Sequence, residues 1–207
     1  MPSDDIDPAE TPLAEWVDRL AQAKGAPGGG AACGVMTGIA AGLLGMVAAY
    51  TADDLEARRA EQRLSDKRRL AMEAAEEDGV RSAAFGAALA MDQGPDRERA
   101  VRQATVDAVA SALDVGRIAA SLLEEVRLLA DIGNPHVEAD LRVAVEALRA
   151  ALEGTNHTAR ADLDLLARHR TADDQLDRQV AGLERDLVDL AEKRTECARI
   201  AAGWASE

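Results

Sequence analysis

The sequence predicts an all-α fold, a compact bundle of helices around a buried, Gly/Ala-rich central helix. Only 2% of the 207 residues are aromatic, and runs of the residues typical of strands are missing. Alanine, the best helix former, is abundant along the whole chain. Residues 31–50 also form a run of twenty residues without a charge, which predicts a helix surrounded by other parts of the protein.

Composition also limits the partners of the protein. The formal net charge of −14 at pH 7 would repel nucleic acids and anionic membranes, and we expect neither as a partner. The two cysteines, Cys33 and Cys197, form no CxxC pair and have no nearby histidine, so we expect a reduced protein without a metal. The first ten residues lack the basic and apolar regions of a signal peptide, which favours a cytoplasmic location.

The chain begins with a short acidic segment. Residues 1–10 contain two prolines and are expected to be disordered, whereas residues 11–207 are expected to form a single helical domain. Thr11 is placed to cap a short helix with Pro12 at its first position. That helix is expected to end near Gly25.

The glycine triplet Gly28–Gly30 leads into the central helix, which is expected to end between Thr51 and Asp53. Its length would span a bilayer. We nevertheless favour a helix wrapped by protein, because it consists mostly of Ala and Gly and has no aromatic belt or flanking basic cluster. Glycine costs roughly 1 kcal/mol per position inside a helix. The ridge of small residues at every fourth position therefore predicts a close helix contact; it consists of Gly34, Gly38 and Gly42.

A charged helix is expected from Asp53 to about Met91. One face of its second half is apolar apart from Asp78. A carboxylate is rare on such a face unless it is paired or functional, so Asp78 is either a site residue or a residue at the solvent boundary. The other residues of this face are Ala71, Ala75, Ser82, Phe85 and Leu89.

After a turn at residues 92–95, a long helix is expected from about Asp96 to Ala130. The tripeptide Gly133-Asn134-Pro135 ends it. Asn134 can cap the following helix, whose apolar stripe continues to Gly154.

In that following helix Asp140 borders the buried face and lies one turn from His136. The last segment, residues 173–200, has apolar residues at alternating steps of four and three, which predicts a heptad seam. The seam would pack either on the body of the protein or on the same helix of a second subunit. It consists of Leu176, Val180, Leu183, Leu187 and Leu190.

The glycine triplet permits two interpretations. A glycine-rich helix start exposes backbone N–H groups that bind phosphate or carboxylate. It also permits tight packing. The triplet lacks the lysine of a P-loop and the pattern of a dinucleotide-binding turn, which argues against nucleotide binding by those two routes.

The glycine triplet and the Gly133-Asn134-Pro135 break together resemble the cyclodeaminase/cyclohydrolase family of folate enzymes. The order and spacing of these motifs, with Asp140 six residues after Asn134, agree with the family over nearly the whole chain. The resemblance implies a helical homodimer with a folate cleft built by the glycine turn and the helix from Asn134 to Asp140. It implies no metal and no cofactor besides the tetrahydrofolate derivative that is the substrate.

The resemblance also implies roles for individual residues. Substrate binding falls to Gly28, Gly29, Gly30, Gly133 and Asn134, and to Thr158 and Asp162, which align with a later family motif. Asp140 and Asp78 match acids of the family, and either is expected to act as the general base if burial raises its pKa. His136 is a third candidate, on the ground that its reference pKa is about 6.5. For His136 the alternative is an exposed first-turn residue without a catalytic role.

Several positions depart from the family pattern. Ala31 and Ala139 replace serines, Val80 replaces an acid, and His136 replaces a residue that is commonly Asn. Residues 52–57 contain no lysine, whereas the family has a lysine-rich stretch after its central helix.

The expected activity is that of a methenyltetrahydrofolate cyclohydrolase or a formimidoyltetrahydrofolate cyclodeaminase. The cyclohydrolase is favoured because no formiminotransferase domain is fused to this sequence. Two alternatives stay open. The same scaffold could be a cyclase, dehydratase or hydrolase for a non-folate metabolite, or the protein could be a non-catalytic helical dimer module.

Overall fold

The computed structural model describes residues 7–23, 25–168 and 174–204. This part of the chain contains helices and no strands, which confirms the all-α prediction. The elements are α1 (Leu13–Leu20), α2 (Gly29–Ala49), α3 (Leu55–Leu89), α4 (Pro95–Ser121), α5 (Leu123–Ile132), the 3₁₀ helix η1 (Pro135–Val137), α6 (Glu138–Arg168) and α7 (Asp174–Trp204).

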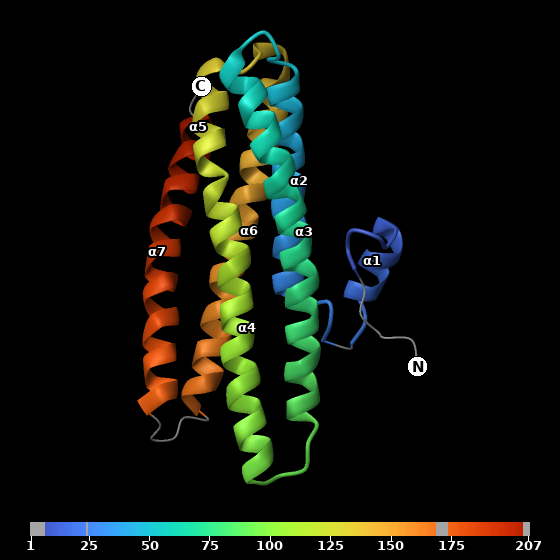
Figure 1. Cartoon of the computed structure of the whole chain (residues 1–207), viewed down its shortest axis with the longest axis vertical. Coiled ribbons are helices and arrows are strands. Elements are labelled where there is room, and N and C mark those ends of the chain that lie inside the picture. The colour runs from blue at the N-terminus through green and yellow to red at the C-terminus, as the bar shows by residue number, and fades with distance from the viewer. Residues whose placement is uncertain (1–6, 24, 169–173, 205–207) are drawn as a thin grey trace.

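The long helices run side by side, and α1 stands apart from them (Figure 1). Helix α2 packs on α3 and α6, and α4 packs on the same two helices from the other side of the bundle. Helix α7 lies outermost, against α6 and α4. The largest group of core side chains lies between α2, α4, α5 and α6 and includes Leu44, Leu113, Val126 and Leu148.

Helix α2 is central, as predicted, and its glycine ridge packs inside the chain. A Cβ on Gly34 would lie 2.6 Å from the Cβ of Ala75, and one on Gly38 would lie 2.9 Å from the Sδ of Met72. The ridge therefore lets α3 approach closely and is not itself a sign of a second subunit. By length and composition α2 could span a membrane, and 56% of its apolar window is buried.

The prediction that protein wraps α2 on all sides is wrong for one face. Ile39, in the middle of the helix, is 49% exposed, and Tyr50 just beyond its end is 61% exposed. No part of the chain that the structure describes covers this face fully.

The N-terminal segment differs in detail from the expectation. Helix α1 begins at Leu13, after Pro12, and Thr11 provides no side-chain cap. Residues 7–10, expected to be disordered, form a turn in which the Thr11 N–H donates to the Asp7 carbonyl at 2.9 Å. Residues 1–6 of that segment lie outside the described residues.

The long helix predicted for residues 96–130 is broken at Leu122, between α4 and α5. Just before the break, the Ser121 carbonyl accepts a hydrogen bond from the Lys67 ammonium at 2.8 Å. The Ser121 hydroxyl turns back to donate to the Ile118 carbonyl at 2.7 Å. Side chains thus bond to backbone groups at the break, which the sequence pattern of this helix does not reveal.

Gly154, where the predicted apolar stripe stops, lies inside α6, which continues to Arg168. A Cβ at Gly154 would lie 2.5 Å from the Sγ of Cys33 on α2. The glycine is therefore explained by the close approach of two helices and not by a C-terminal cap.

The heptad seam of α7 packs on the body of the same chain. Leu176, Val180, Leu187 and Leu190 are all buried in the single chain. This decides between the two alternatives for the seam. The first residue of the predicted segment, Asp173, lies outside the described residues.

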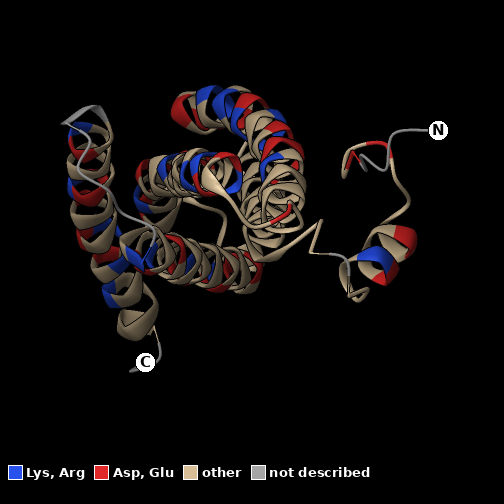
Figure 2. Cartoon of the chain, turned by 90° about the horizontal axis from the view of Figure 1, so that it is seen from below, with Lys and Arg blue, Asp and Glu red and all other residues tan. Residues whose placement is uncertain are grey.

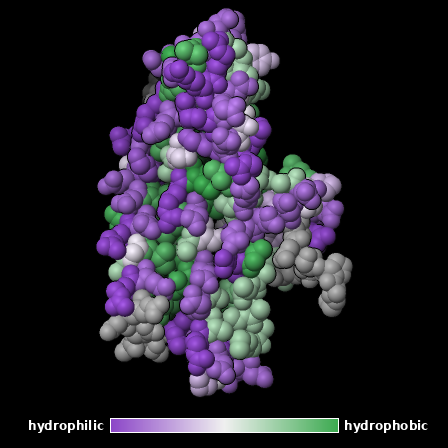
Figure 3. Space-filling view, in the orientation of Figure 1, coloured by the Kyte–Doolittle hydropathy of each residue, from purple (hydrophilic) through white to green (hydrophobic). Residues whose placement is uncertain are grey.

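The face of the protein in Figure 3 is largely hydrophilic, with apolar patches between the helices. A pale apolar area lies near the lower end of this view. Ala83, Ala84 and Ala87, near the C-terminal end of α3, are exposed.

Candidate functional site

Asp78 is a buried carboxylate at the start of α2. It projects from α3, is only 5% exposed, and accepts a hydrogen bond from the backbone N–H of Ala31 in the first turn of α2. The Ser111 hydroxyl on α4 donates to its Oδ1 at 3.4 Å, and the Ser82 hydroxyl also donates to it. Of the two interpretations of Asp78, the position at the solvent boundary is therefore excluded.

Gly30 is required by the position of Asp78. A Cβ on Gly30 would overlap both carboxylate oxygens of Asp78. The N-cap residue of α2, Gly28, has no side-chain cap. Asp78 supplies the missing acceptor from another helix, where free N–H groups and the helix dipole favour a negative charge.

The charge of Asp78 affects a second carboxylate, that of Asp162. Burial raises the pKa of Asp78 to about 6, although hydrogen bonds from Ser111, Ala31 and Ser82 act in the opposite direction. Burial, and then the charge of Asp78, raise the pKa of Asp162 on α6 to about 6. Two interacting acids that titrate near neutral pH are suited to general acid–base chemistry.

The same face of α6 brings two threonines to the glycine turn. A Cβ on Gly29 would lie 3.3 Å from the Cγ2 of Thr158. One turn earlier on α6, the buried Thr155 hydroxyl lies against the Cys33 thiol of α2 and hydrogen-bonds with it.

Cys33 also lies near this group. Burial raises the pKa of its thiol to about 11; the hydrogen bond with Thr155 acts in the opposite direction, and the charge of Asp78 raises the pKa further. Its thiol is therefore protonated at neutral pH, which excludes a role as a thiolate nucleophile.

Sequence reasoning missed Ser111, Thr155 and Cys33 as neighbours of the site. The spacing of Thr155, Thr158 and Asp162 by three and four residues was the available signal, because it places all three on one face of a helix.

The second group of predicted residues lies at the other end of α2. The Asn134 backbone N–H donates to the Thr51 hydroxyl at 3.0 Å, and the Asn134 side-chain amide donates to the Tyr50 carbonyl at 3.1 Å. The Asn134 Oδ1 accepts the N–H of His136 at 3.0 Å, as predicted for a cap. His136 itself is exposed, and Asp140 is half-buried.

A cavity of about 220 Å³ adjoins this second group and is lined by Gly133, Asn134, Glu138 and Trp204, among others. Helix α2 has 21 residues, so its two ends are about 30 Å apart. Within one chain, the glycine turn and the Asn134–Asp140 segment therefore lie at opposite ends of α2 and do not meet. The structure brings Gly28–Gly30, Asp78, Thr158 and Asp162 together and places Gly133, Asn134, His136 and Asp140 elsewhere.

Among the described residues, no three His, Cys, Asp or Glu side chains are grouped so that they could hold a metal ion. The chemistry that this arrangement offers is proton transfer by the two carboxylates, next to backbone N–H groups and hydroxyls that can orient a bound molecule.

Comparison with known proteins gives two matches. A family model described as formiminotransferase-cyclodeaminase matches residues 12–180. A crystal structure of a formiminotetrahydrofolate cyclodeaminase from Thermotoga maritima is similar with a TM-score of 0.76 and 20% sequence identity, over 95% of this chain and 98% of that chain. At this identity the structural likeness establishes the fold alone. A search of the curated proteins gives no significant match.

Proposed function

The chain belongs to the formiminotransferase-cyclodeaminase family, and on that premise we propose that it acts on a one-carbon derivative of tetrahydrofolate. The preferred reaction is the hydrolysis of the 5,10-methenyl cation to 10-formyl-tetrahydrofolate. The observation that carries this proposal is the pair formed by Asp78 and Asp162, both with a pKa of about 6, at the glycine turn of α2.

The charge of the substrate fits this pair. The methenyl carbon lies between two nitrogens that share one positive charge. Water attacks the cation most readily at this carbon. Coulomb attraction between this cation and a carboxylate is strong where water is largely excluded, and Asp78 is 5% exposed. The same cation is formed when ammonia leaves a 5-formimino group and the ring closes, so the acidic pair also suits the deaminase reaction.

Asp78 and Asp162 can perform the proton transfers of the hydrolysis. One carboxylate takes a proton from water as the water oxygen bonds to the methenyl carbon. The carbon–N5 bond then breaks while the new hydroxyl loses its proton and N5 receives one. Water is consumed and one proton is released overall. A carboxyl with a pKa of about 6 is ionised at neutral pH and still returns its proton readily.

The direct test follows the absorbance of 5,10-methenyl-tetrahydrofolate with wild type and with Asp78→Asn. The proposal predicts enzyme-dependent decay that falls at least about 100-fold in Asp78→Asn. Glu77→Gln is the matched control, because Glu77 is the preceding residue and its side chain is 52% exposed and paired with Arg81. It should keep wild-type activity.

Two outcomes would contradict the proposal. Full activity in Asp78→Asn would remove Asp78 from the chemistry. Neither binding nor decay with the wild type would remove folate as the substrate. Ammonia release from 5-formimino-tetrahydrofolate, measured on the same samples, separates the deaminase from the hydrolase.

A second candidate keeps the site and changes the substrate. Ala139 and Val80 stand where the family has a serine and an acid, and Val80 is 39% exposed. These losses of polar groups favour a smaller or less polar metabolite as the substrate of the same acid pair. Two results together would support this candidate. The wild type would fail to bind tetrahydrofolate, and Asp78→Asn would lose the pH-dependent binding of another ligand that the wild type shows.

A further inference from the structure

Two carboxylates are buried in the part of the chain that the structure describes, although the chain as a whole is rich in charged residues (Figure 2). One is Glu125, which lies 2.8 Å from Arg63 and 3.1 Å from Lys67. The other is Asp78, which forms no ion pair with any described residue, so that hydrogen-bond donors stabilise its charge. A buried carboxylate of this kind depends on the number and the direction of its donors.

Three donors reach the Asp78 carboxylate from three helices. They are the Ala31 N–H of α2, the Ser82 hydroxyl of α3 and the Ser111 hydroxyl of α4, which lies 3.4 Å from Oδ1. An ionised carboxylate has about four acceptor positions on its two oxygens. The three donors therefore leave about one position for a proton that comes from a bound water.

The three donors constrain the carboxylate to different degrees. Ser82 lies one turn beyond Asp78 on the same helix and moves with it, whereas Ala31 and Ser111 lie on other helices. The terminal torsion of an aspartate side chain is broad. A single donor from outside the helix therefore leaves the plane of the carboxylate free to turn, and a second donor fixes it. Ser111 is 6% exposed, so water does not replace its hydroxyl.

We propose that Ser111 is a positioning residue for the candidate site: its hydroxyl fixes the plane of the Asp78 carboxylate so that the open acceptor position faces the water that attacks the substrate. The inference rests on the proposed function for the proton transfer itself. The hydrogen bond between the two side chains can be tested without it.

Other hydroxyls on the helices provide a comparison for Ser111. Thr37, Thr105 and Thr195 each donate to the backbone carbonyl four residues earlier, at 2.7–2.8 Å. This local bond is common for a hydroxyl inside a helix. Thr105 is buried on α4, the helix that also carries Ser111. Ser111 instead donates to a residue 33 positions away in the sequence, which indicates that the carboxylate directs its hydroxyl.

Two titratable groups interact with Asp78. They are Asp162 on α6 and Cys33 on α2; burial is the main cause of the raised pKa of both, and the charge of Asp78 adds to it. Among the described residues no basic group lowers the pKa of Asp78 itself. Burial raises that pKa, and the Ser111 hydrogen bond is the largest of the effects that lower it. The loss of the Ser111 hydroxyl should therefore shift the titration of Asp78.

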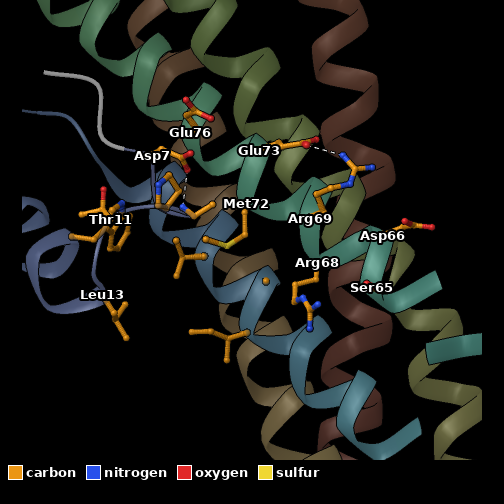
Figure 4. Close-up of a pocket in the computed structure, with 16 residues that line it drawn as sticks. Asp7, Thr11, Leu13, Ser65, Asp66, Arg68, Arg69, Met72, Glu73 and Glu76 are labelled. Carbon is orange, nitrogen blue, oxygen red and sulfur yellow. Dashed lines mark hydrogen bonds and ion pairs between the residues drawn. The ribbon is translucent and has the colours of Figure 1, made fainter. Parts of the chain in front are cut away.

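The charged side chains of α3 and α4 around Asp78 form ion pairs with one another. These pairs are Glu73 with Arg69, Glu77 with Arg81, and Asp107 with Arg81. Glu73 and Arg69 line a cavity of about 870 Å³ that lies between α3, α2 and the N-terminal segment (Figure 4). Neither Asp78 nor Ser111 is among the residues that line it. These pairs thus leave the charge of Asp78 dependent on its hydrogen-bond donors.

The first experiment measures the titration of Asp78 by carbon NMR on protein with labelled aspartate carboxyls. The Asp78 signal is the one missing in Asp78→Asn, and the Asp162 signal is assigned in the same way, because interacting acids titrate together. Ser111→Ala should move the Asp78 midpoint up by at least about 0.5 pH unit, because the ionised carboxylate loses a donor. Thr105→Val is the matched control. It removes a buried hydroxyl from the same helix, but that hydroxyl donates to the Val101 carbonyl, so the midpoint should not move.

The second experiment measures the enzyme-dependent decay of 5,10-methenyl-tetrahydrofolate. At pH 8, where Asp78 is ionised, Ser111→Ala should lower kcat by about ten-fold and change KM by less than about two-fold, because the orientation of the carboxylate matters in the transition state. The acid limb of its kcat profile should move to higher pH by about as much as the NMR midpoint. Thr105→Val should keep the wild-type kcat and the wild-type profile.

Three results would overturn the proposal. These are an unchanged NMR midpoint in Ser111→Ala, an equal shift in Thr105→Val, and an unchanged kcat and pH profile in Ser111→Ala. If the wild type does not turn over the substrate, the proposed function fails, whereas the NMR titration still decides whether Ser111 holds the Asp78 carboxylate. The two failures are therefore distinguishable.

Discussion

The carboxylate of Asp78 occupies the space that a Cβ of Gly30 would need. This contact joins the glycine turn of α2 to the buried acid of α3, and each residue explains the other. The acid accepts an N–H group from the first turn of α2, and the glycine leaves room for it.

Gly30→Ala should therefore lower the free energy of unfolding by about 2 kcal/mol or more, because the new methyl group must displace a buried carboxylate. Gly86→Ala is the matched control. Gly86 lies inside α3, and a Cβ added to it would meet nothing within 4 Å, so alanine should stabilise the protein by up to about 1 kcal/mol. Urea unfolding measures both variants. Equal effects of the two substitutions would contradict the contact.

Asp78→Asn should be more stable than wild type at pH 7, by up to about 3 kcal/mol. The folded protein holds the Asp78 proton up to a pH of about 6, whereas the unfolded chain releases it near pH 4. Between these values the native state binds more protons, so the stability of the wild type falls as the pH rises. Asparagine has no charge to bury. Thermal unfolding from pH 4 to pH 7.5 should show the difference opening with rising pH, and a constant difference would contradict the raised pKa.

Glu125→Gln should destabilise the protein by about 1–3 kcal/mol at pH 7. The Glu125 side chain is 2% exposed and lies 2.8 Å from Arg63 and 3.1 Å from Lys67. Burial raises the pKa of Glu125, but the hydrogen bonds from Arg63 and Lys67 outweigh this effect and lower it. This stabilisation is present above the unfolded-state pKa and is lost as the pH falls through the folded-state pKa, so the two proteins should converge in acid.

Glu73→Gln provides the comparison for Glu125→Gln. Glu73 pairs with Arg69, but both side chains are more than half exposed, so its loss should change stability by less than about 0.5 kcal/mol. Denaturant titration of both variants at pH 7 and pH 4 checks the pair. An effect of Glu73→Gln as large as that of Glu125→Gln would rule out burial as the cause.

Leu187→Ala should cost about 2–4 kcal/mol, because Leu187 is 5% exposed in the seam of α7. Val188→Ala, at the next residue, should be nearly neutral, because Val188 is 62% exposed. Both effects should be independent of protein concentration, since the seam packs within one chain. A loss of stability on dilution in Leu187→Ala alone would instead assign the seam to an interface between chains.

The features that sequence reasoning predicts correctly are local. Gly133, Asn134 and Pro135 break the chain between two helices, and the side chain of Asn134 caps the turn that follows. Asp78 stands out because a single acid interrupts an apolar face. Such signals depend on residues that are neighbours along the chain, which is why a sequence displays them.

The features that it misses depend on contacts between distant segments. In the sequence Gly154 resembles the end of a helix. In the structure a glycine stands there because Cys33, on another helix, leaves no room for a Cβ. The break after Ser121 depends on Lys67, and neither residue predicts the other. The separation of the two groups of site residues within one chain is missed for a related reason: spacing along the sequence does not reveal that they lie at opposite ends of α2.

The six glycines in α2 also bear on the order in which the protein folds. Each costs roughly 1 kcal/mol relative to alanine in a helix, so this segment has little tendency to form a helix by itself in the unfolded chain. It gains helical structure only as Ala75, Met72 and Asp78 of α3 close on it. Helix α3, with its ion pairs between successive turns, can begin to form alone. Helix α2 therefore forms against α3, and the candidate site forms in the same step.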